Sequence, residues 1–257
     1  MTIFYFTGTG NSLAVAKKIG NKNASLISIP QIMDSSTMHY SDDIIGIVFP
    51  VYFCSAPTMV REFLKKIKLE AKYFFAVATH GGMVGNSLKH VQKFGKIKFD
   101  YANDIRMVDN YLPLYEISKE AAADAKRNTA EKIIAIADDI DNCKLKKTRT
   151  KILGKILSGI LGNKRIYNKY PQNYIVDDKC NKCGICAKVC LAKNIVVNKN
   201  VTFDNKCEAC FACLHLCPQN ALHHKKQKSL KRWLHADVSL NEIILSNNRI
   251  TDEGLAE

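Results

Sequence analysis

Eight of the ten cysteines lie in two copies of one spacing, and this repeat constrains the chain more than any other feature. Both copies read Cys-x2-Cys-x2-Cys-x3-Cys. The first runs from Cys180 to Cys190, and the second runs from Cys207 to Cys217 and is followed by Pro218. The N-terminus shows neither the basic region nor the cleavage site of a signal peptide, so the thiols point to metal or redox chemistry instead of disulfides.

This spacing predicts two cubane [4Fe–4S] clusters, because the fourth cysteine of such a run ligates the other cluster. One cluster is therefore assigned to Cys180, Cys183, Cys186 and Cys217, and the other to Cys190, Cys207, Cys210 and Cys213. Zinc is the alternative, but four cysteines per run, present twice, exceed what a zinc site needs. The first run is followed by Leu191 where the second run is followed by Pro218, and this difference removes no ligand.

The N-terminal half carries a different signal, a strand followed by a polar loop and a helix. Residues 2–6 are apolar, and residues 13–19 have a helical pattern. Such a loop before a helix suits a phosphate group, held by backbone N–H groups and hydroxyls. Leu13 occupies the position of the third glycine of a Rossmann fingerprint, and no Walker lysine is present. The candidate residues are Thr7, Gly8, Thr9, Gly10, Asn11 and Ser12.

The rest of this half alternates strand and helix, which predicts an α/β fold with a doubly wound, five-stranded parallel sheet. Further strands are expected near residues 24–29, 44–50, 72–79 and 104–108, and helices near residues 57–68, 86–94 and 118–142. In such a sheet the ligand binds at the carboxyl ends of the strands. We therefore add candidate binding residues from the loops at 50–57 and 79–86: Pro50, Val51, Tyr52, Phe53, His80, Gly81 and Gly82.

Two features of these loops bear on their chemistry. Tyr52 is interpreted either as a ring that stacks on a planar ligand or as ordinary packing. The loops at 7–12, 50–57 and 79–86 contain no acidic residue, so we expect little repulsion of an anionic ligand.

Taken together, the chain resembles the flavodoxin–ferredoxin fusions of bacteria and archaea. The matching strings are Phe6-Thr7-Gly8-Thr9-Gly10-Asn11-Ser12, Phe49-Pro50-Val51-Tyr52, His80-Gly81-Gly82, Asp109-Asn110-Tyr111 and the second cysteine run. The resemblance implies FMN in a flavodoxin-like domain at 1–142, and an α+β 2[4Fe–4S] ferredoxin domain at 174–222. Many flavodoxins have a glycine in the second loop whose peptide flips, whereas residues 50–57 contain none.

Basic charge is concentrated between these two parts. The net charge is +14, and residues 143–173 hold nine Lys and Arg and no Asp or Glu. Apolar pairs at 152/153, 156/157 and 160/161 recur every four residues, which predicts a basic amphipathic linker helix. It could pack on the first domain or lie on an anionic membrane. Residues 223–257 form a C-terminal extension with a predicted short capped helix at 239–244.

The leading functional hypothesis is a cytoplasmic electron carrier that passes electrons between FMN, the two clusters and a redox partner. The basic surface favours an acidic partner protein, and little indicates nucleic-acid binding. The alternative is an FMN-dependent reductase of a small molecule that the clusters supply, with His80 as a proton donor. The sequence assigns no catalytic residue.

Overall fold

The computed structural model describes residues 1–35, 38–147 and 169–247. Most of the predicted linker helix therefore lies outside the described residues. Among the helices that are described, none is long and apolar enough to cross a membrane.

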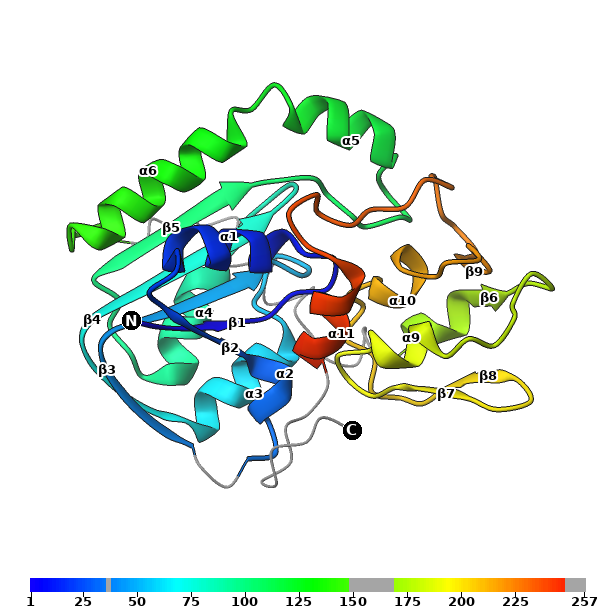
Figure 1. Ribbon diagram of the computed structural model, residues 1–257, viewed down its shortest axis with the longest axis horizontal. Coiled ribbons are helices and arrows are strands. Elements are labelled where there is room, and N and C mark those ends of the chain that lie inside the picture. The colour runs from blue at the N-terminus through cyan, green and yellow to red at the C-terminus, as the bar shows by residue number, and fades with distance from the viewer. Residues whose placement is uncertain (36–37, 148–168, 248–257) are drawn as a thin grey trace.

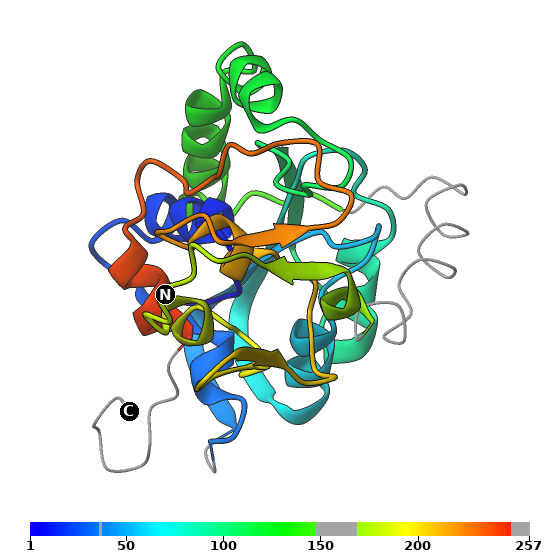
Figure 2. The same ribbon diagram turned by 90° about the vertical axis from the view of Figure 1, so that its right-hand side faces the viewer.

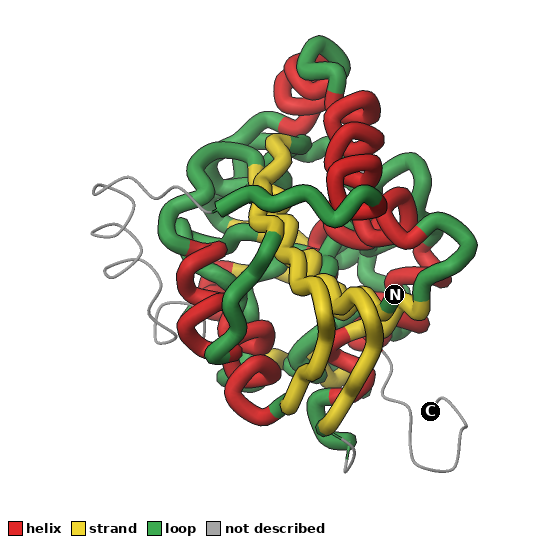
Figure 3. The backbone as a smooth tube through the Cα atoms, turned by 90° about the vertical axis from the view of Figure 1, so that its left-hand side faces the viewer, coloured by secondary structure: helices red, strands yellow, loops and turns green. Residues whose placement is uncertain are grey.

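The N-terminal half is built on a parallel sheet of five strands in the order β2-β1-β3-β4-β5 (Figure 1). This is the flavodoxin-like order, and it confirms the predicted α/β architecture. The strands are β1 (Thr2–Tyr5), β2 (Ser25–Ser28), β3 (His39–Pro50), β4 (Lys68–His80) and β5 (Tyr101–Arg106). The central strands β3 and β4 are much longer than predicted, because they stay paired from His39↔Lys68 to Pro50↔Thr79 (Figure 3).

Helices cover both faces of the sheet, as alternating apolar residues along the strands require. Ile3 and Tyr5 pack on one face with α1 (Asn11–Gly20) and α6 (Thr129–Asp141). Phe4 and Phe6 pack on the other face. That second face is covered by α2 (Ile29–Ile32), α3 (Thr58–Lys66) and α4 (Ser87–Gly95).

The single helix predicted for residues 118–142 is wrong, because the structure has two helices there. These are α5 (Ile117–Asp124) and α6, separated by a turn in which Asn128 adopts a left-handed conformation with φ 51°. The Asp124 carboxylate accepts hydrogen bonds from the Thr129 hydroxyl at 3.1 Å and from Arg127 at 3.3 Å. Asp and Asn form such local bonds readily, and they stabilise the break.

The C-terminal half consists of short elements around the two cysteine runs, and Figure 2 views the molecule from this side. Each run leads into a one-turn helix that carries its third cysteine, and the fourth cysteine follows that helix. Two antiparallel strand pairs flank them, β6 with β9 and β7 with β8. The bounds are η1 (Tyr170–Asn173), β6 (Tyr174–Val176), α9 (Ile185–Lys188), β7 (Ile195–Val197), β8 (Val201–Phe203), α10 (Ala212–His215) and β9 (Leu222–His224).

The two halves share one apolar core. Val189 and Leu216, which belong to the cysteine-rich half, pack in the same cluster as Leu13 and Val15 of α1. The C-terminal extension strengthens this contact, because α11 (Leu240–Asn247) lies between the halves (Figure 1).

The start of α11 confirms the predicted short capped helix, with a capping box at its N-terminus. The Ser239 Oγ accepts from Glu242 N at 3.2 Å, and the Glu242 carboxylate accepts from Ser239 N at 2.8 Å. The far end of the helix reaches both halves: Ser246 bonds the Tyr5 hydroxyl at 2.7 Å, and Asn247 donates to Val189 O at 2.8 Å. The extension therefore ties the two halves together.

Candidate functional site

A cavity of about 230 Å³ opens at the carboxyl ends of β1, β3, β4 and β5. Twelve of the thirteen residues predicted to bind FMN line it: Thr7, Gly8, Thr9, Asn11, Ser12, Pro50, Val51, Tyr52, Phe53, His80, Gly81 and Gly82. The three predicted loops thus meet at one place, as the strand order requires.

Gly10 is the predicted residue that does not line the cavity. Its backbone has φ +97°, and a Cβ there would lie 2.9 Å from the Cβ of His235 and 3.1 Å from that of Val238. His235 N also donates to Thr9 O at 3.0 Å. Gly10 is therefore required by its left-handed backbone and by the C-terminal segment that crosses it.

The hydroxyls of the first loop are held by neighbours but keep hydrogens to donate. Thr7 Oγ1 accepts from Gly10 N at 3.1 Å, and Thr9 Oγ1 accepts from the Asn110 amide at 2.6 Å. Because both oxygens act as acceptors in these bonds, each O–H remains a donor. Within the described parts of the chain, no hydrogen bond occupies the backbone N–H groups of Thr9, Asn11 or Ser12. This donor set at the start of α1 fits a phosphate.

The second loop is a tight turn in which two non-glycine residues adopt left-handed conformations. Tyr52 and Ser55 exchange both backbone hydrogen bonds, at 2.9 and 3.0 Å, and Phe53 and Cys54 between them have φ 50° and 59°. A turn with two positive φ values normally uses Asn, Asp or Gly, so this backbone is strained. Tyr52 packs edge-to-face on Phe6 with ring centroids 6.2 Å apart, and its side chain also lines the cavity, which is compatible with both interpretations of this residue.

His80 in the third loop has both ring nitrogens engaged. Its Nδ1 lies 2.9 Å from Gly82 O, and its Nε2 lies 3.1 Å from an Asp104 carboxylate oxygen. Arg106 Nε donates to Gly81 O at 2.6 Å. These contacts fix the loop and hold the imidazole between Gly82 and Asp104.

A fourth loop, which sequence reasoning did not place in the site, adds an acidic residue to the cavity wall. Asp109 lines the cavity, and burial, followed by the effect of Glu120, raises its pKa to about 6, although the backbone N–H of Tyr111 opposes this. Gly81 lies so close that a Cβ there would come within 2.1 Å of the Asp109 Cβ. The three predicted loops contain no acid, but Asp109 adds a carboxyl group to the cavity wall and so weakens the expectation of little repulsion for an anionic ligand. The position of residues 107–111 could have predicted this, because they follow the carboxyl end of β5, the next strand of the sheet.

The second cysteine run forms part of the same cavity wall. Ala209 and Phe211 line the cavity, and both have left-handed backbones, with φ 53° and 59°. Phe211 meets Tyr111 edge-to-face with ring centroids 5.3 Å apart. A Cβ on Gly8 would lie 3.1 Å from Cys210 O. The cysteine loop is thus in contact with the loop that suits a phosphate.

A second, smaller cavity lies behind this wall. Its lining includes all four cysteines of one predicted ligand set, Cys190, Cys207, Cys210 and Cys213. Phe211 lines this cavity and also the first one. Backbone N–H groups point at the sulfurs, with Asn194 N 3.2 Å from Cys190 Sγ and Ala209 N 3.2 Å from Cys207 Sγ. Hydrogen bonds of this kind stabilise thiolates at cluster sites.

The other predicted set is gathered nearer the surface. The pKa of Cys186 is raised to about 11, first by burial and then by the charges of Cys217, Cys180 and Cys183. Cys183 is exposed, whereas Cys213 of the inner set is buried. The charged neighbours of Cys186 are thus the three other cysteines that the crossed assignment gives to the same set, and the ligation of clusters stays a prediction. Within the described ranges, no three His, Cys, Asp or Glu side chains form a group that could hold a metal ion.

No family model matches the sequence, and no curated protein matches it either. Similar solved structures include a flavoprotein in complex with FMN from Lactobacillus acidophilus, with 16% identity over 40% of this chain and 91% of that chain and a TM-score of 0.30. An azoreductase from Bacillus anthracis has 10% identity over 54% of this chain and 100% of that chain, with a TM-score of 0.34. An NADH:FMN oxidoreductase in its apo form has 13% identity over 60% of this chain and 95% of that chain, with a TM-score of 0.34. Scores this low decide nothing about the ligands of this chain.

Proposed function

We propose that this chain is an electron-transfer protein that binds FMN in the first cavity and two [4Fe–4S] clusters on the eight repeated cysteines. The observation that supports it best is that Phe211, inside the second cysteine run, lines both the first cavity and the cavity of the inner cysteine set. A flavin and a cluster in these places would be separated by one loop. The resemblance to flavodoxin–ferredoxin fusions adds the same pairing of cofactors.

The donors present are of the kind that each group needs, N–H and hydroxyl groups for a phosphate and thiols for iron. FMN, when bound, supplies an exchange between two-electron and one-electron chemistry, and each cluster carries one electron at a time. The free N–H groups of Thr9, Asn11 and Ser12 would hold the phosphate. Phe211 and Tyr111 would exclude water beside the ring system.

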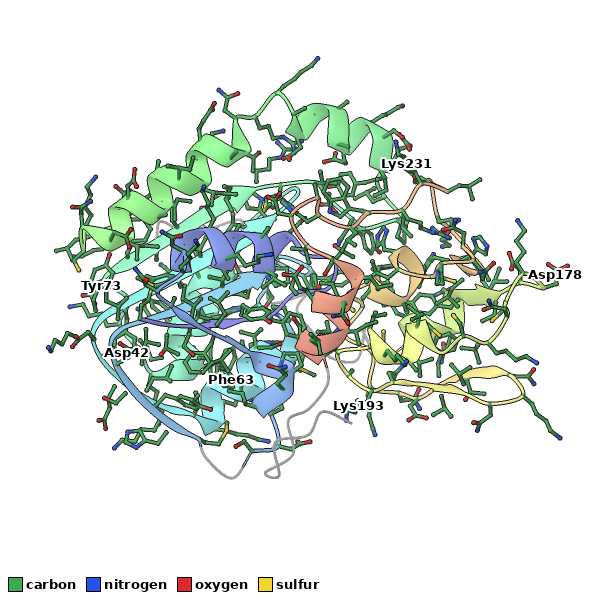
Figure 4. The ribbon with its side chains drawn as sticks, viewed as in Figure 1. Asp42, Phe63, Tyr73, Asp178, Lys193 and Lys231 are labelled. Carbon is green, nitrogen blue, oxygen red and sulfur yellow. The ribbon has the colours of Figure 1, made fainter. Side chains whose placement is uncertain are left out.

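Exposure orders the two clusters. The set with Cys207 and Cys213 adjoins the flavin cavity, whereas the set with Cys183 reaches the surface. Electrons would therefore enter or leave through the outer set. Exposed lysines at 179, 182 and 188 flank that set, and Asp178 lies at the tip of the same half, far from Tyr73 at the opposite end of the molecule (Figure 4). With the basic surface of the whole chain, this favours an acidic partner protein.

A second candidate function is reduction of a small molecule at the flavin. It is favoured by the mouth of the first cavity, where Met83 is 56% exposed and Leu114 54% exposed. Asp109, which lines the cavity and whose pKa burial raises to about 6, is a carboxyl group that could donate a proton there. Turnover of a small quinone or nitroaromatic at the mouth, lost in Asp109→Asn with electron transfer to proteins unchanged, would favour this function.

Anaerobic purification followed by composition analysis tests the main proposal. The expected result is one FMN, about eight iron and about eight sulfide per chain. Zinc in place of iron would contradict the cluster assignment, and absence of flavin above background would contradict the assignment of the first cavity.

A further inference from the structure

Glu208 connects the two halves at the point where the proposed cofactors meet. It lies between Cys207 and Cys210, and its side chain is buried. One carboxylate oxygen accepts from Thr58 N at 3.0 Å, and the other accepts from Met59 N at 3.1 Å. A residue of the cysteine loop therefore caps a helix of the sheet half.

The capped helix has no cap of its own. Helix α3 starts at Thr58 after Pro57, whose side chain cannot accept a hydrogen bond. A carboxylate at this place satisfies two N–H groups that the helix leaves unpaired, and its negative charge interacts favourably with the positive end of the helix dipole. The two charge-assisted bonds also offset the cost of burying the carboxylate.

The location of this cap gives it a consequence beyond stability. The turn at 52–55 lines the first cavity and runs directly into α3, while Ala209 and Phe211, on the same loop as Glu208, form another wall. The carboxylate therefore bonds the end of one cavity loop to the start of another. Loss of the Glu208 carboxylate would remove both of these bonds between the cysteine loop and the start of α3.

We infer that Glu208 is a positioning residue that sets the separation between the flavin and the inner cluster, and thereby the rate at which electrons cross between them. This inference rests on the proposed function. With both groups bound, one electron would leave the reduced flavin and one would be gained by the inner cluster, and no bond at Glu208 would form or break.

Glu116 provides a matched control. Its carboxylate caps α5 in the same way, accepting from Ser118 N at 3.1 Å and Lys119 N at 2.9 Å, but it lies outside both cysteine runs and does not line the flavin cavity. Replacing either glutamate by alanine removes two bonds to a helix N-terminus. Glu116 also accepts from the Ser229 hydroxyl at 3.1 Å, so its replacement additionally releases a bond to the C-terminal extension. Only replacement of Glu208 removes bonds made by the cysteine loop.

The experiment measures flavin-to-cluster electron transfer after flash photoreduction of the anaerobic holoprotein, together with iron content, flavin content and amide exchange at Thr58 and Met59. In Glu208→Ala the transfer rate should fall about tenfold or more, since small displacements of reacting groups carry large rate costs. Glu208→Gln keeps one carbonyl acceptor and should recover part of the rate. Glu116→Ala should lower the Tm, because α5 loses its cap, but it should leave the electron-transfer rate unchanged.

Two results would overturn the inference. One is a wild-type transfer rate in Glu208→Ala that retains its flavin and iron, and the other is an equal fall in rate in Glu116→Ala. If Glu208→Ala fails to assemble clusters, the same assay is applied to Glu208→Gln. An unchanged transfer rate in Glu208→Gln, together with faster amide exchange at Thr58, would count against a positioning role. Wild-type protein without flavin or iron would instead contradict the proposed function, and amide exchange would still report the cap.

Discussion

Gly8 lies directly against Cys210, so that a Cβ on Gly8 would come within 3.1 Å of the Cys210 carbonyl oxygen and 3.2 Å of its Cβ. Gly8 belongs to the loop that suits a phosphate, and Cys210 belongs to the inner cysteine set. A Cβ on Gly8 would also lie 3.1 Å from the Tyr52 hydroxyl, so even a methyl group between the two proposed cofactor sites would require these neighbours to shift.

Gly8→Ala should therefore displace the cysteine loop. We expect a loss of about 1–3 kcal/mol in stability, as for overpacking elsewhere, together with weaker flavin binding and slower flavin-to-cluster transfer. Gly82→Ala is the control, because a Cβ there would meet only the Tyr115 hydroxyl, at 3.2 Å. Equal effects of the two substitutions on thermal unfolding and flavin affinity would contradict the importance of the Gly8–Cys210 contact.

Trp233→Phe tests the C-terminal segment. The indole Nε1 donates to Asn11 Oδ1 at 3.0 Å, while the amide of Asn11 donates to Val108 O at 3.0 Å. Loss of the first bond should cost about 1 kcal/mol and release flavin faster, because Asn11 is no longer held from both sides. Leu230→Ala, at a side chain that is 77% exposed in the same segment, should change neither property. Flavin release followed by fluorescence distinguishes the two.

The raised pKa of Asp109 should make the stability of the folded chain depend on pH. Its pKa of about 6 exceeds the ordinary 3.8, so between these values the folded chain binds more protons than the unfolded chain, and stability falls as the pH rises. Asp109→Asn should remove this fall, with a gain of about 3 kcal/mol at most above pH ~6 that shrinks towards pH ~4. Thermal unfolding across this range checks the trend. A gain that is constant with pH would assign the effect to packing.

Iron removal should occur in two phases. The set containing exposed Cys183 is open to a chelator, whereas the set containing buried Cys213 is shielded by the cavity wall. Under anaerobic conditions the visible absorbance of the clusters should fall in two steps of similar size, with flavin retained through the first. In Cys183→Ser the early step should be accelerated or absent. A single phase in the wild type would contradict the proposed inner and outer positions.

Much of the sheet half could be predicted from sequence, because its strands are apolar runs and its loops carry distinctive residues. The alternation fixed five strands, and the strand order then brings residues 7–12, 50–53 and 80–82 to one cavity. The helix break at Asn128 was missed because the apolar pattern continues across it, and only the local bonds of Asp124 end the first helix.

The contacts between the halves could not be predicted. Ala209 and Phe211 face the first cavity only because their left-handed backbones turn that way, and no periodicity reports a single φ. Glu208 caps a helix 150 residues earlier in the chain, and Trp233 bonds Asn11 across 222 residues. Such bonds depend on how two folded parts meet, which local propensity does not encode.

The central claim is that flavin and clusters exchange electrons within one chain through the loop from Cys207 to Cys213. The most direct measurement is flash photoreduction of the flavin in the anaerobic wild-type holoprotein, followed by the visible and EPR signals of the clusters. The account predicts that clusters gain electrons as the flavin loses them, at a rate independent of protein concentration. A flavin that stays reduced beside oxidised clusters, or a rate proportional to protein concentration, would contradict it.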